Sequence, residues 1–174
     1  AFRKTLPAVA GQAPGHELPF PFNIRRSLGG WKVLFFKQGP VLTLNNPSDQ
    51  IKRGQYLVEG PGHCGECHTP RNLLGGPKFG QWLAGAVNPE GEGVIQNITT
   101  GEGGIADWSE SQLASMLKDG FTPEFDSVGG SMTAVVANWS HVSDEDRAAV
   151  AAYLKAVPAH ANGYPVLTKP AANQ

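Results

Sequence analysis

The sequence predicts a mostly helical, loop-rich fold without a large sheet. Three segments have the apolar periodicity and boundary residues of helices, whereas long runs of Val and Ile, which a large sheet needs, are missing. The 22 Gly and 14 Pro residues make up about a fifth of the 174 residues, above the usual share of roughly 12%. We therefore expect many turns and little regular core, so that a bound cofactor could supply apolar material for the helices to pack against.

Residues 1–46 are expected to form an irregular N-terminal arm, because Pro and Gly interrupt the stretch LPAVAGQAPGHELPFPF. Within the arm, residues 23–39 are compatible with a short helical turn and carry aromatic side chains and four basic residues. Two interpretations of residues 20–36 stay open. Their aromatic side chains either cover the chain's own domain, or form a docking surface for a partner protein or a membrane face.

Three segments have helix boundaries, and they cover residues 47–59, 109–119 and 143–157. Each has a serine at its start that can accept a hydrogen bond from the first turn, and each is followed by Gly or Pro. The serines are Ser48, Ser109 and Ser143, and the residues that follow are Gly60, Gly120 and Pro158. In the second segment, Gln112 completes the capping-box pattern.

Apolar side chains recur at helical spacing in these segments, which predicts one buried face for each helix. In the last helix the face consists of Val150, Tyr153, Leu154 and Val157. Residues 69–107 are expected to be loops, with a short extended piece at 94–98. Residues 47–160 are accordingly expected to form one domain, followed by a C-terminal tail at 161–174.

Both cysteines lie in the pattern Cys64-Gly65-Glu66-Cys67-His68, which is the haem c attachment signature. Two thiols three positions apart on a helical turn can each reach one vinyl group of a haem. The imidazole of the next residue can then reach the iron from the same side. The sequence therefore predicts one haem c, covalently bound through Cys64 and Cys67, with His68 as an axial iron ligand.

Three other interpretations of the cysteine pair are weaker. A thioredoxin-like site needs the pair at the start of a helix that follows a strand, and the segment before Cys64 is helical and Gly-rich. A zinc site would crowd all its ligands, with His63 as a fourth, into six residues. A disulfide across two residues is strained and stabilises little. His63 is expected to lie at the surface.

Met132 is the best candidate for the second axial ligand of the iron. It follows His68 by 64 residues, which is enough chain to wrap a porphyrin, and it lies in a segment expected to be flexible before the last helix. Met116 lies on the apolar face of the helix at 109–119 and is expected to be a core residue. The remaining alternatives are histidines, namely His141, His16 and His160.

Charge and composition narrow the possible functions. The net charge of −1 gives no general preference for nucleic acid or for an anionic membrane, so any charged docking patch must be local. No stretch approaches the ~20 consecutive apolar residues of a membrane span. The sequence also lacks paired carboxylates or a nucleophile and base at recognisable spacing. We therefore expect an electron carrier rather than an enzyme that makes or breaks bonds.

With these residues in place, the chain resembles class I c-type cytochromes. It is most similar to a haem module of the cytochrome subunits that serve membrane-associated bacterial alcohol, aldehyde and sugar-acid (gluconate-type) dehydrogenases. The resemblance rests on four stretches. They are RGQYLVEGPGHCGECHTPRNLLGG (53–76), NIT…GIADWSESQLASML (97–117), SMTAVVANWSHVSDEDRAAVAAYLKAVP (131–158) and FPFNIRRSLGGWKVLFF (20–36). Those subunits usually carry several haem motifs, whereas this chain has one.

The resemblance implies an all-α class I cytochrome c fold in which the first and last helices cross at Gly54. It also implies His68 and Met132 as the two axial ligands. Around the haem it suggests propionate contacts from three residues, and they are Arg71, Asn97 and Trp108. A backbone carbonyl between residues 69 and 80, with Pro70 and Pro77 as candidates, is expected to orient His68 through its second ring nitrogen.

The function implied by the resemblance is one-electron transfer between a periplasmic dehydrogenase and the respiratory chain. The expected partners are therefore a dehydrogenase as donor and an oxidase or another cytochrome as acceptor. Covalent haem attachment takes place outside the bacterial cytoplasm, which implies a periplasmic location. The alternative is a haem enzyme that acts on a peroxide or a sulfur compound, and this requires an open or labile second axial position.

Overall fold

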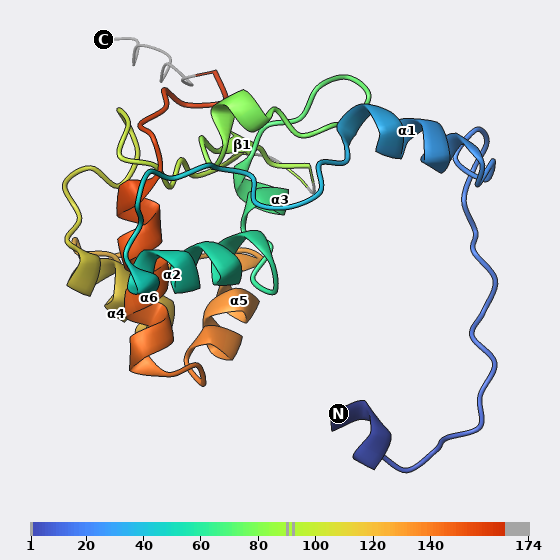
Figure 1. Ribbon diagram of the computed structural model, residues 1–174, viewed down its shortest axis with the longest axis horizontal. Helices are drawn as coiled ribbons and strands as arrows, with labels where there is room; N and C mark the ends of the chain where they lie inside the picture. The colour runs from blue at the N-terminus through green and yellow to red at the C-terminus, as the bar shows by residue number, and fades with distance from the viewer. Residues whose placement is uncertain (1, 90, 92, 166–174) are drawn as a thin grey trace, which may run out of the picture. The chain divides into compact units, whose positions relative to one another are not determined.

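The computed structural model describes residues 2–89, 91 and 93–165, and it divides into two units. The first unit ends at Phe36 and contains the 3-10 helix η1 (Phe2–Thr5) and the α-helix α1 (Ser27–Phe35), joined by a stretch without regular secondary structure (Figure 1). The second unit begins at Lys37. Residues 37–46, expected as part of the arm, thus group with the second unit, and residues 166–174 of the expected tail lie outside the described part.

The second unit is mostly helical. Its longer helices are α2 (Asp49–Glu59), α4 (Glu110–Asp119), α5 (Met132–Trp139) and α6 (Asp144–Ala156). Two single turns, α3 (Gly65–His68) and η2 (Phe79–Gln81), lie between α2 and α4, together with the short strands β1 (Ala86–Val87) and β2 (Val94–Ile95). The strands pair antiparallel, with Ala86 opposite Ile95. The prediction of a mostly helical fold with little sheet is confirmed.

The predicted helix boundaries are also confirmed. The hydroxyl groups of Ser48, Ser109 and Ser143 each accept a hydrogen bond of 3.2 Å from the backbone N–H three residues later. The Gln112 side chain accepts a hydrogen bond from the Ser109 N–H, which completes the capping box. Gly120 ends α4 with a φ of 81°, a conformation that glycine adopts without strain.

Helix α5 is a correction, because the sequence analysis expected a flexible segment there. Its N-cap, Ser131, makes no side-chain hydrogen bond to the helix, and Gly129 and Gly130 precede it. Only Val136 of this helix is buried. The sequence of this segment therefore lacks both a capping residue at its start and a broad apolar stripe. In the structure, Met132 is the first residue of a helix rather than part of a loop.

Helices α2 and α6 cross at close range, as Figure 1 shows. A Cβ on Gly54 would lie 1.9 Å from the carbonyl oxygen of Ala149 and 2.8 Å from the Cβ of Tyr153. Any side chain at this position would therefore collide with the backbone of α6. The predicted role of Gly54 at the crossing is confirmed.

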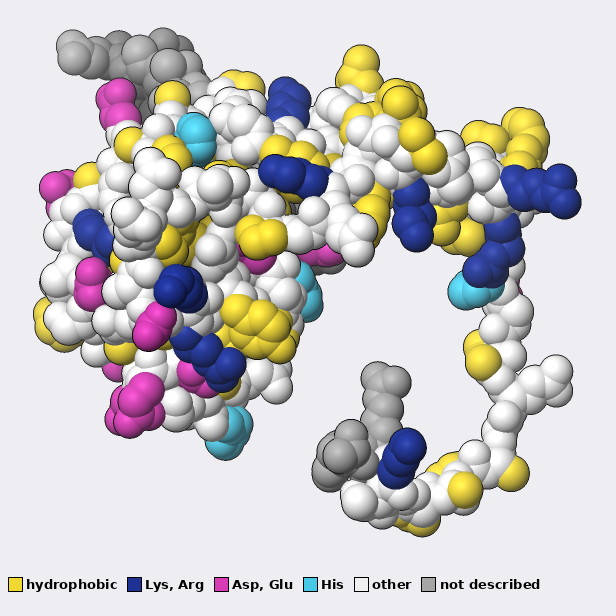
Figure 2. Space-filling view, in the orientation of Figure 1, with side chains coloured by type: hydrophobic (Ala, Val, Ile, Leu, Met, Phe, Trp, Pro, Cys, Tyr) yellow, Lys and Arg dark blue, Asp and Glu magenta, His cyan; other side chains and the backbone are white. Residues whose placement is uncertain are grey.

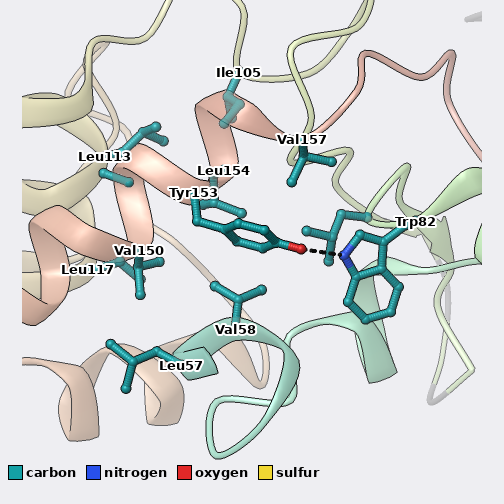
Figure 3. Close-up of a cluster of buried hydrophobic side chains, with 12 residues drawn as sticks. Leu57, Val58, Trp82, Ile105, Leu113, Leu117, Val150, Tyr153, Leu154 and Val157 are labelled. Atoms are coloured by element: carbon teal, nitrogen blue, oxygen red, sulfur yellow. Dashed lines mark hydrogen bonds between the residues drawn. The ribbon is translucent and has the colours of Figure 1, made fainter. Parts of the chain in front are cut away.

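A buried cluster fills the space around this crossing (Figure 3). Tyr153 is fully buried within it, and its hydroxyl accepts a hydrogen bond of 3.2 Å from the Trp82 indole and donates one of 2.5 Å to the Glu59 carboxylate. The same carboxylate accepts a 2.7 Å hydrogen bond from the Val41 N–H. This network joins α2, α6 and the loop that follows the cysteine turn. None of the described helices is long and apolar enough to cross a bilayer.

Candidate haem-attachment site

A short connection at residues 60–63 joins α2 to the cysteine turn. Cys64 occupies the N-cap position of α3, and His68 is the last residue of this helix. The His68 N–H donates to the Cys64 carbonyl at 3.0 Å, so the whole pattern forms one helical turn. Cys64 is half-buried, Cys67 is exposed and both thiols are free. His63 precedes the turn and is exposed, as expected.

The His68 imidazole is fixed by the carbonyl of Gln96, which lies 2.7 Å from its Nδ1. A carbonyl can only accept, so Nδ1 carries the proton and Nε2 keeps its lone pair for a metal. Burial lowers the pKa of His68, while the Gln96 hydrogen bond acts in the opposite direction. A neutral imidazole with a fixed tautomer is the form that binds iron.

Gln96 corrects one expectation of the sequence analysis. The orienting carbonyl was expected between residues 69 and 80, with Pro70 and Pro77 as candidates. Instead, the Pro70 carbonyl accepts a hydrogen bond of 2.9 Å from the Lys78 N–H within its own loop. Gln96 follows β2 and is 28 residues from His68. Every residue type has a backbone carbonyl, so the sequence carried no signal for this contact.

Trp82 lies against the cysteine turn, although the sequence analysis did not identify it. Its ring atoms are 2.0 Å from the position that a Cβ on Gly65 would take, so only glycine fits between the indole and the turn. The loop carrying Trp82 is held in place because the Gly85 N–H donates to the His68 carbonyl at 2.7 Å. The glycine after the first cysteine was the available signal for this close packing.

The environment of Cys64 does not suit thiol redox chemistry. Its side chain packs against the buried cluster, and burial raises the pKa of its thiol to about 11. Reactive cysteines need a lowered pKa, since the thiolate is the nucleophile. Within residues 2–89, 91 and 93–165, no three His, Cys, Asp or Glu side chains are gathered so as to hold a metal ion. The zinc interpretation therefore finds no ligand set there.

Met132 is half-buried and packs against the same cluster as Cys64. The far end of its helix lies close to the segment before the cysteine turn, because the Trp139 ring is 3.1 Å from the position that a Cβ on Gly62 would take. Helix α5 thus carries Met132 at one end and touches the segment before Cys64 at the other. Met116 also packs against the cluster, from α4. The role of Met132 as an iron ligand remains a prediction.

The three histidines considered as alternatives to Met132 lie in different surroundings. His16 belongs to the first unit, and it and His141 are exposed. His160 is half-buried, and its carbonyl accepts a hydrogen bond of 2.9 Å from the Asn97 side chain. None of these observations gives a histidine the apolar packing that Met132 has.

The three residues expected to contact the propionates differ in how many hydrogen bonds their polar groups make within the protein. The exposed Arg71 donates to the Gly75 carbonyl at 2.8 Å. Asn97 is buried, and both its amide hydrogens and its oxygen are engaged by protein groups. Trp108 is half-buried and packs against the buried cluster. The propionate contacts of all three residues remain predictions.

Taken together, these residues fit a covalently bound haem. The turn offers two thiols and an oriented imidazole, and the half-buried side chains that edge the cluster offer apolar surface. These side chains include Phe79, Ile98, Trp108, Met132 and Trp139. A haem held there would pack against the protein on an apolar face, which favours a stable iron site over a solvent-filled one.

Comparison with known proteins adds two findings. The sequence profile of the family described as cytochrome c matches residues 51–158. A diheme cytochrome c-type protein of Cereibacter sphaeroides is 52% identical over 160 residues, which cover 91% of this chain and 52% of that protein.

Two further relatives are named as subunits of dehydrogenases. The fructose dehydrogenase cytochrome subunit of Gluconobacter japonicus is 40% identical, over 88% of this chain and 32% of its own length. The cytochrome c subunit of the alcohol dehydrogenase (quinone) of Gluconobacter oxydans is 31% identical, over 93% of this chain and 35% of its own length. The chain thus spans about half or less of the length of these relatives.

Proposed function

This chain belongs to the cytochrome c family, and we propose that it carries single electrons through one haem c bound at Cys64 and Cys67. The observation that supports this most is the 2.7 Å contact between His68 Nδ1 and the Gln96 carbonyl, at the end of the cysteine turn. It leaves Nε2 as the only ring nitrogen with a free lone pair. When bound, the haem supplies the one-electron step between ferric and ferrous iron.

The protein's own residues have separate parts in this proposal. Cys64 and Cys67 form the thioethers, and His68 holds one axial position of the iron. Met132 holds the other, supported by its half-buried place against the cluster that also borders Cys64. Two permanent axial ligands keep substrates away from the iron, and a methionine raises the reduction potential relative to a second histidine.

The partners of the chain follow from its relatives. Cytochrome subunits of fructose and alcohol dehydrogenases are among them. We propose that a dehydrogenase reduces this chain and that an oxidase or another cytochrome of the respiratory chain reoxidises it, in the periplasm. The chain then serves as an electron carrier and leaves substrate oxidation to the partner.

The test is the absorption spectrum of the oxidised and reduced holoprotein, with Met132→Ala and Met116→Ala as a matched pair. Both methionines are half-buried against the same cluster, so packing losses should be similar. We expect the wild type and Met116→Ala to show the weak red charge-transfer band of a methionine-bound ferric haem. Met132→Ala should lose the band and bind cyanide at least tenfold faster.

Other outcomes would change specific parts of the proposal. A band that survives Met132→Ala removes Met132 as the ligand. A wild type that lacks the band and binds cyanide rapidly favours a haem enzyme with an open second position. A chain that acquires no haem under conditions that support attachment overturns the proposal altogether.

A further inference from the structure

The first unit exposes an unusual amount of apolar surface. Between residues 18 and 37, here called the aromatic–basic segment, eight large apolar side chains are exposed, and no residue of α1 is buried. They are Leu18, Phe20, Phe22, Ile24, Leu28, Val33, Leu34 and Phe36, with exposed fractions from 47% to 86%. An apolar patch of this kind on a protein surface marks a binding site.

The same segment is strongly basic. It contains Arg25, Arg26, Lys32 and Lys37, and no Asp or Glu occurs between Glu17 and Asp49. Residues 1–36 carry five Lys or Arg against one Glu, a net charge of +4, whereas residues 37–174 carry nine against fourteen, a net charge of −5. The near-neutral total thus conceals a basic first unit. Figure 2 shows hydrophobic and basic side chains next to one another along this unit.

Helix α1 carries a stripe of apolar side chains. Leu28, Trp31, Leu34 and Phe35 recur at i, i+3, i+6 and i+7, which places them on one stripe of the helix. The Trp31 and Phe35 rings lie 5.4 Å apart, centroid to centroid. Lys32 lies beside this stripe, with its Nζ 5.4 Å from the centre of the Phe36 ring. A long basic side chain beside aromatic residues can keep its charge in water while its stem follows apolar surface.

We propose that the aromatic–basic segment binds the surface of an anionic lipid bilayer. Its aromatic and aliphatic side chains would enter the boundary between headgroups and acyl chains, where Trp and Phe are favoured, while its four cations face lipid phosphates. The apolar residues are spread over turns and a helix, and a fluid interface accommodates such a spread without a preformed groove. The proposal does not depend on the axial ligands or on the redox role of the haem.

The charge distribution favours lipid over a general protein partner. Each Lys or Arg near an anionic membrane adds to the attraction, and an acidic side chain within the segment would oppose it. Residues 18–48, which include the segment, contain four Lys or Arg residues and no Asp or Glu. The second unit, which begins at Lys37, has a net charge of −5 and is repelled by such a membrane, so the attraction must come from Lys37 and the basic residues of the first unit.

The first experiment is sedimentation of the full-length holoprotein with vesicles. Vesicles of phosphatidylcholine alone are compared with vesicles that also contain phosphatidylglycerol, at low and at high salt. We expect binding only to the anionic vesicles, with an affinity that falls as salt rises. Removal of three segment cations (Arg25→Gln, Arg26→Gln and Lys32→Gln) should weaken binding at least tenfold.

A matched control removes three cations from the second unit (Lys52→Gln, Lys78→Gln and Lys118→Gln). These residues are exposed, so both triple variants lose the same charge from the surface. We expect the control to change binding by less than twofold, and the haem spectrum to stay unchanged in both variants. Equal losses in the two variants would overturn the proposal, because net charge rather than the segment would then decide binding.

Trypsin provides a readout at the segment itself. It cleaves after Arg25, Arg26 and Lys32, and anionic vesicles should slow cleavage there at least tenfold while neutral vesicles leave it unchanged. Equal cleavage with both kinds of vesicle overturns the proposal. An absence of binding to both kinds of vesicle also overturns the proposal. In that case, slower reduction of the segment variant by an acidic redox protein would identify a protein as the partner of the segment.

Discussion

Helices α1 and α6 each carry an apolar stripe, but their surroundings are opposite. Seven of the thirteen residues of α6 are buried, whereas none of the nine residues of α1 is. The apolar stripe of α6 faces α2 and α4, and that of α1 has no such neighbour within its own unit. An apolar stripe therefore predicts that this face of the helix will be covered, but it does not identify the covering partner.

The two helices also differ in how far their own sequences support them. Ser143 caps α6 through its side chain, and three acidic residues occupy its first turn. Helix α1 has no side-chain cap at Arg26 and contains Gly29 and Gly30. Each glycine costs about 1 kcal/mol relative to Ala, and isolated helices of fewer than about 12 residues are marginal in water. We infer that α1 needs a covering surface to stay helical. Helix α6 depends less on its cap than α1 depends on that surface.

The largest expected effect separates a glycine of the α2–α6 crossing from a glycine of α1. Gly54→Ala places a methyl group 1.9 Å from the Ala149 carbonyl oxygen, so the helices must separate. We expect the free energy of unfolding to fall by about 3 kcal/mol or more. Gly29→Ala meets no atom within 4 Å and should leave the unfolding of the second unit unchanged.

Urea unfolding of the two holoprotein variants, followed by circular dichroism at 222 nm, measures this difference. Gly29→Ala should slightly raise the helical signal of the native protein, since Ala favours a helix by about 1 kcal/mol. An unchanged urea midpoint for Gly54→Ala would show that the crossing is looser than described. The comparison between the two helices would then lose its main support.

The features that were predicted correctly from the sequence depend on residues that are close together in the chain. Capping serines, terminal glycines and the five residues from Cys64 to His68 each fall within a few positions of one another. The crossing at Gly54 was implied by the family resemblance, and the absence of a side chain there is what permits the close approach. Such features depend on residue type and spacing, and these can be read from one sequence.

The missed parts depend on contacts that are distant in the chain or independent of residue type. Gln96 orients His68 through a backbone carbonyl, which any residue could supply from that position. Helix α5 forms without a side-chain cap and with one buried residue, so its tertiary surroundings decide its conformation. Trp82 reaches Gly65 only because the loop after η2 folds back on the cysteine turn.

The second prediction concerns the buried hydroxyl of Tyr153 in α6. Helix α1 has no buried hydroxyl of this kind. Tyr153→Phe leaves the Trp82 indole and the Glu59 carboxylate each without one partner. We expect the free energy of unfolding to fall by about 1–3 kcal/mol. Tyr56→Phe is the control, because this tyrosine of α2 is 61% exposed and should change stability by less than about 0.5 kcal/mol. Similar losses would contradict the network.

The same hydroxyl predicts a loss of stability in alkali. Burial, and next the hydrogen bond to Glu59, raise the pKa of Tyr153 far above its ordinary value. The folded protein therefore keeps this hydroxyl protonated, while the unfolded chain ionises it above pH ~10. Its contribution to stability is complete below that pH and declines above it. Urea midpoints from pH 8 to 11 should fall more steeply for the wild type than for Tyr153→Phe.

The smallest effect is expected at the surface ion pair that joins α2 to α6. Arg53 donates to both carboxylate oxygens of Asp146, at 2.7 and 2.8 Å. The hydrogen bond from Arg53 lowers the pKa of Asp146, so the pair contributes above the ordinary pKa near 3.9 and is lost as the pH falls through the lowered value. Its side chains are partly exposed, which keeps the contribution small.

Two carboxylates in the first turn of α6 allow this pair to be isolated. Asp146→Asn removes the partner of Arg53, whereas Glu145→Gln removes a neighbouring exposed charge and leaves the Arg53 pair intact. Both variants lose the same favourable interaction with the helix N-terminus, so their difference reports the ion pair. We expect Asp146→Asn to have the lower urea midpoint at pH 7 and the two midpoints to converge near pH 2. Equal midpoints at pH 7 would mean that the crossing depends on Gly54 and the buried cluster without help from surface charge.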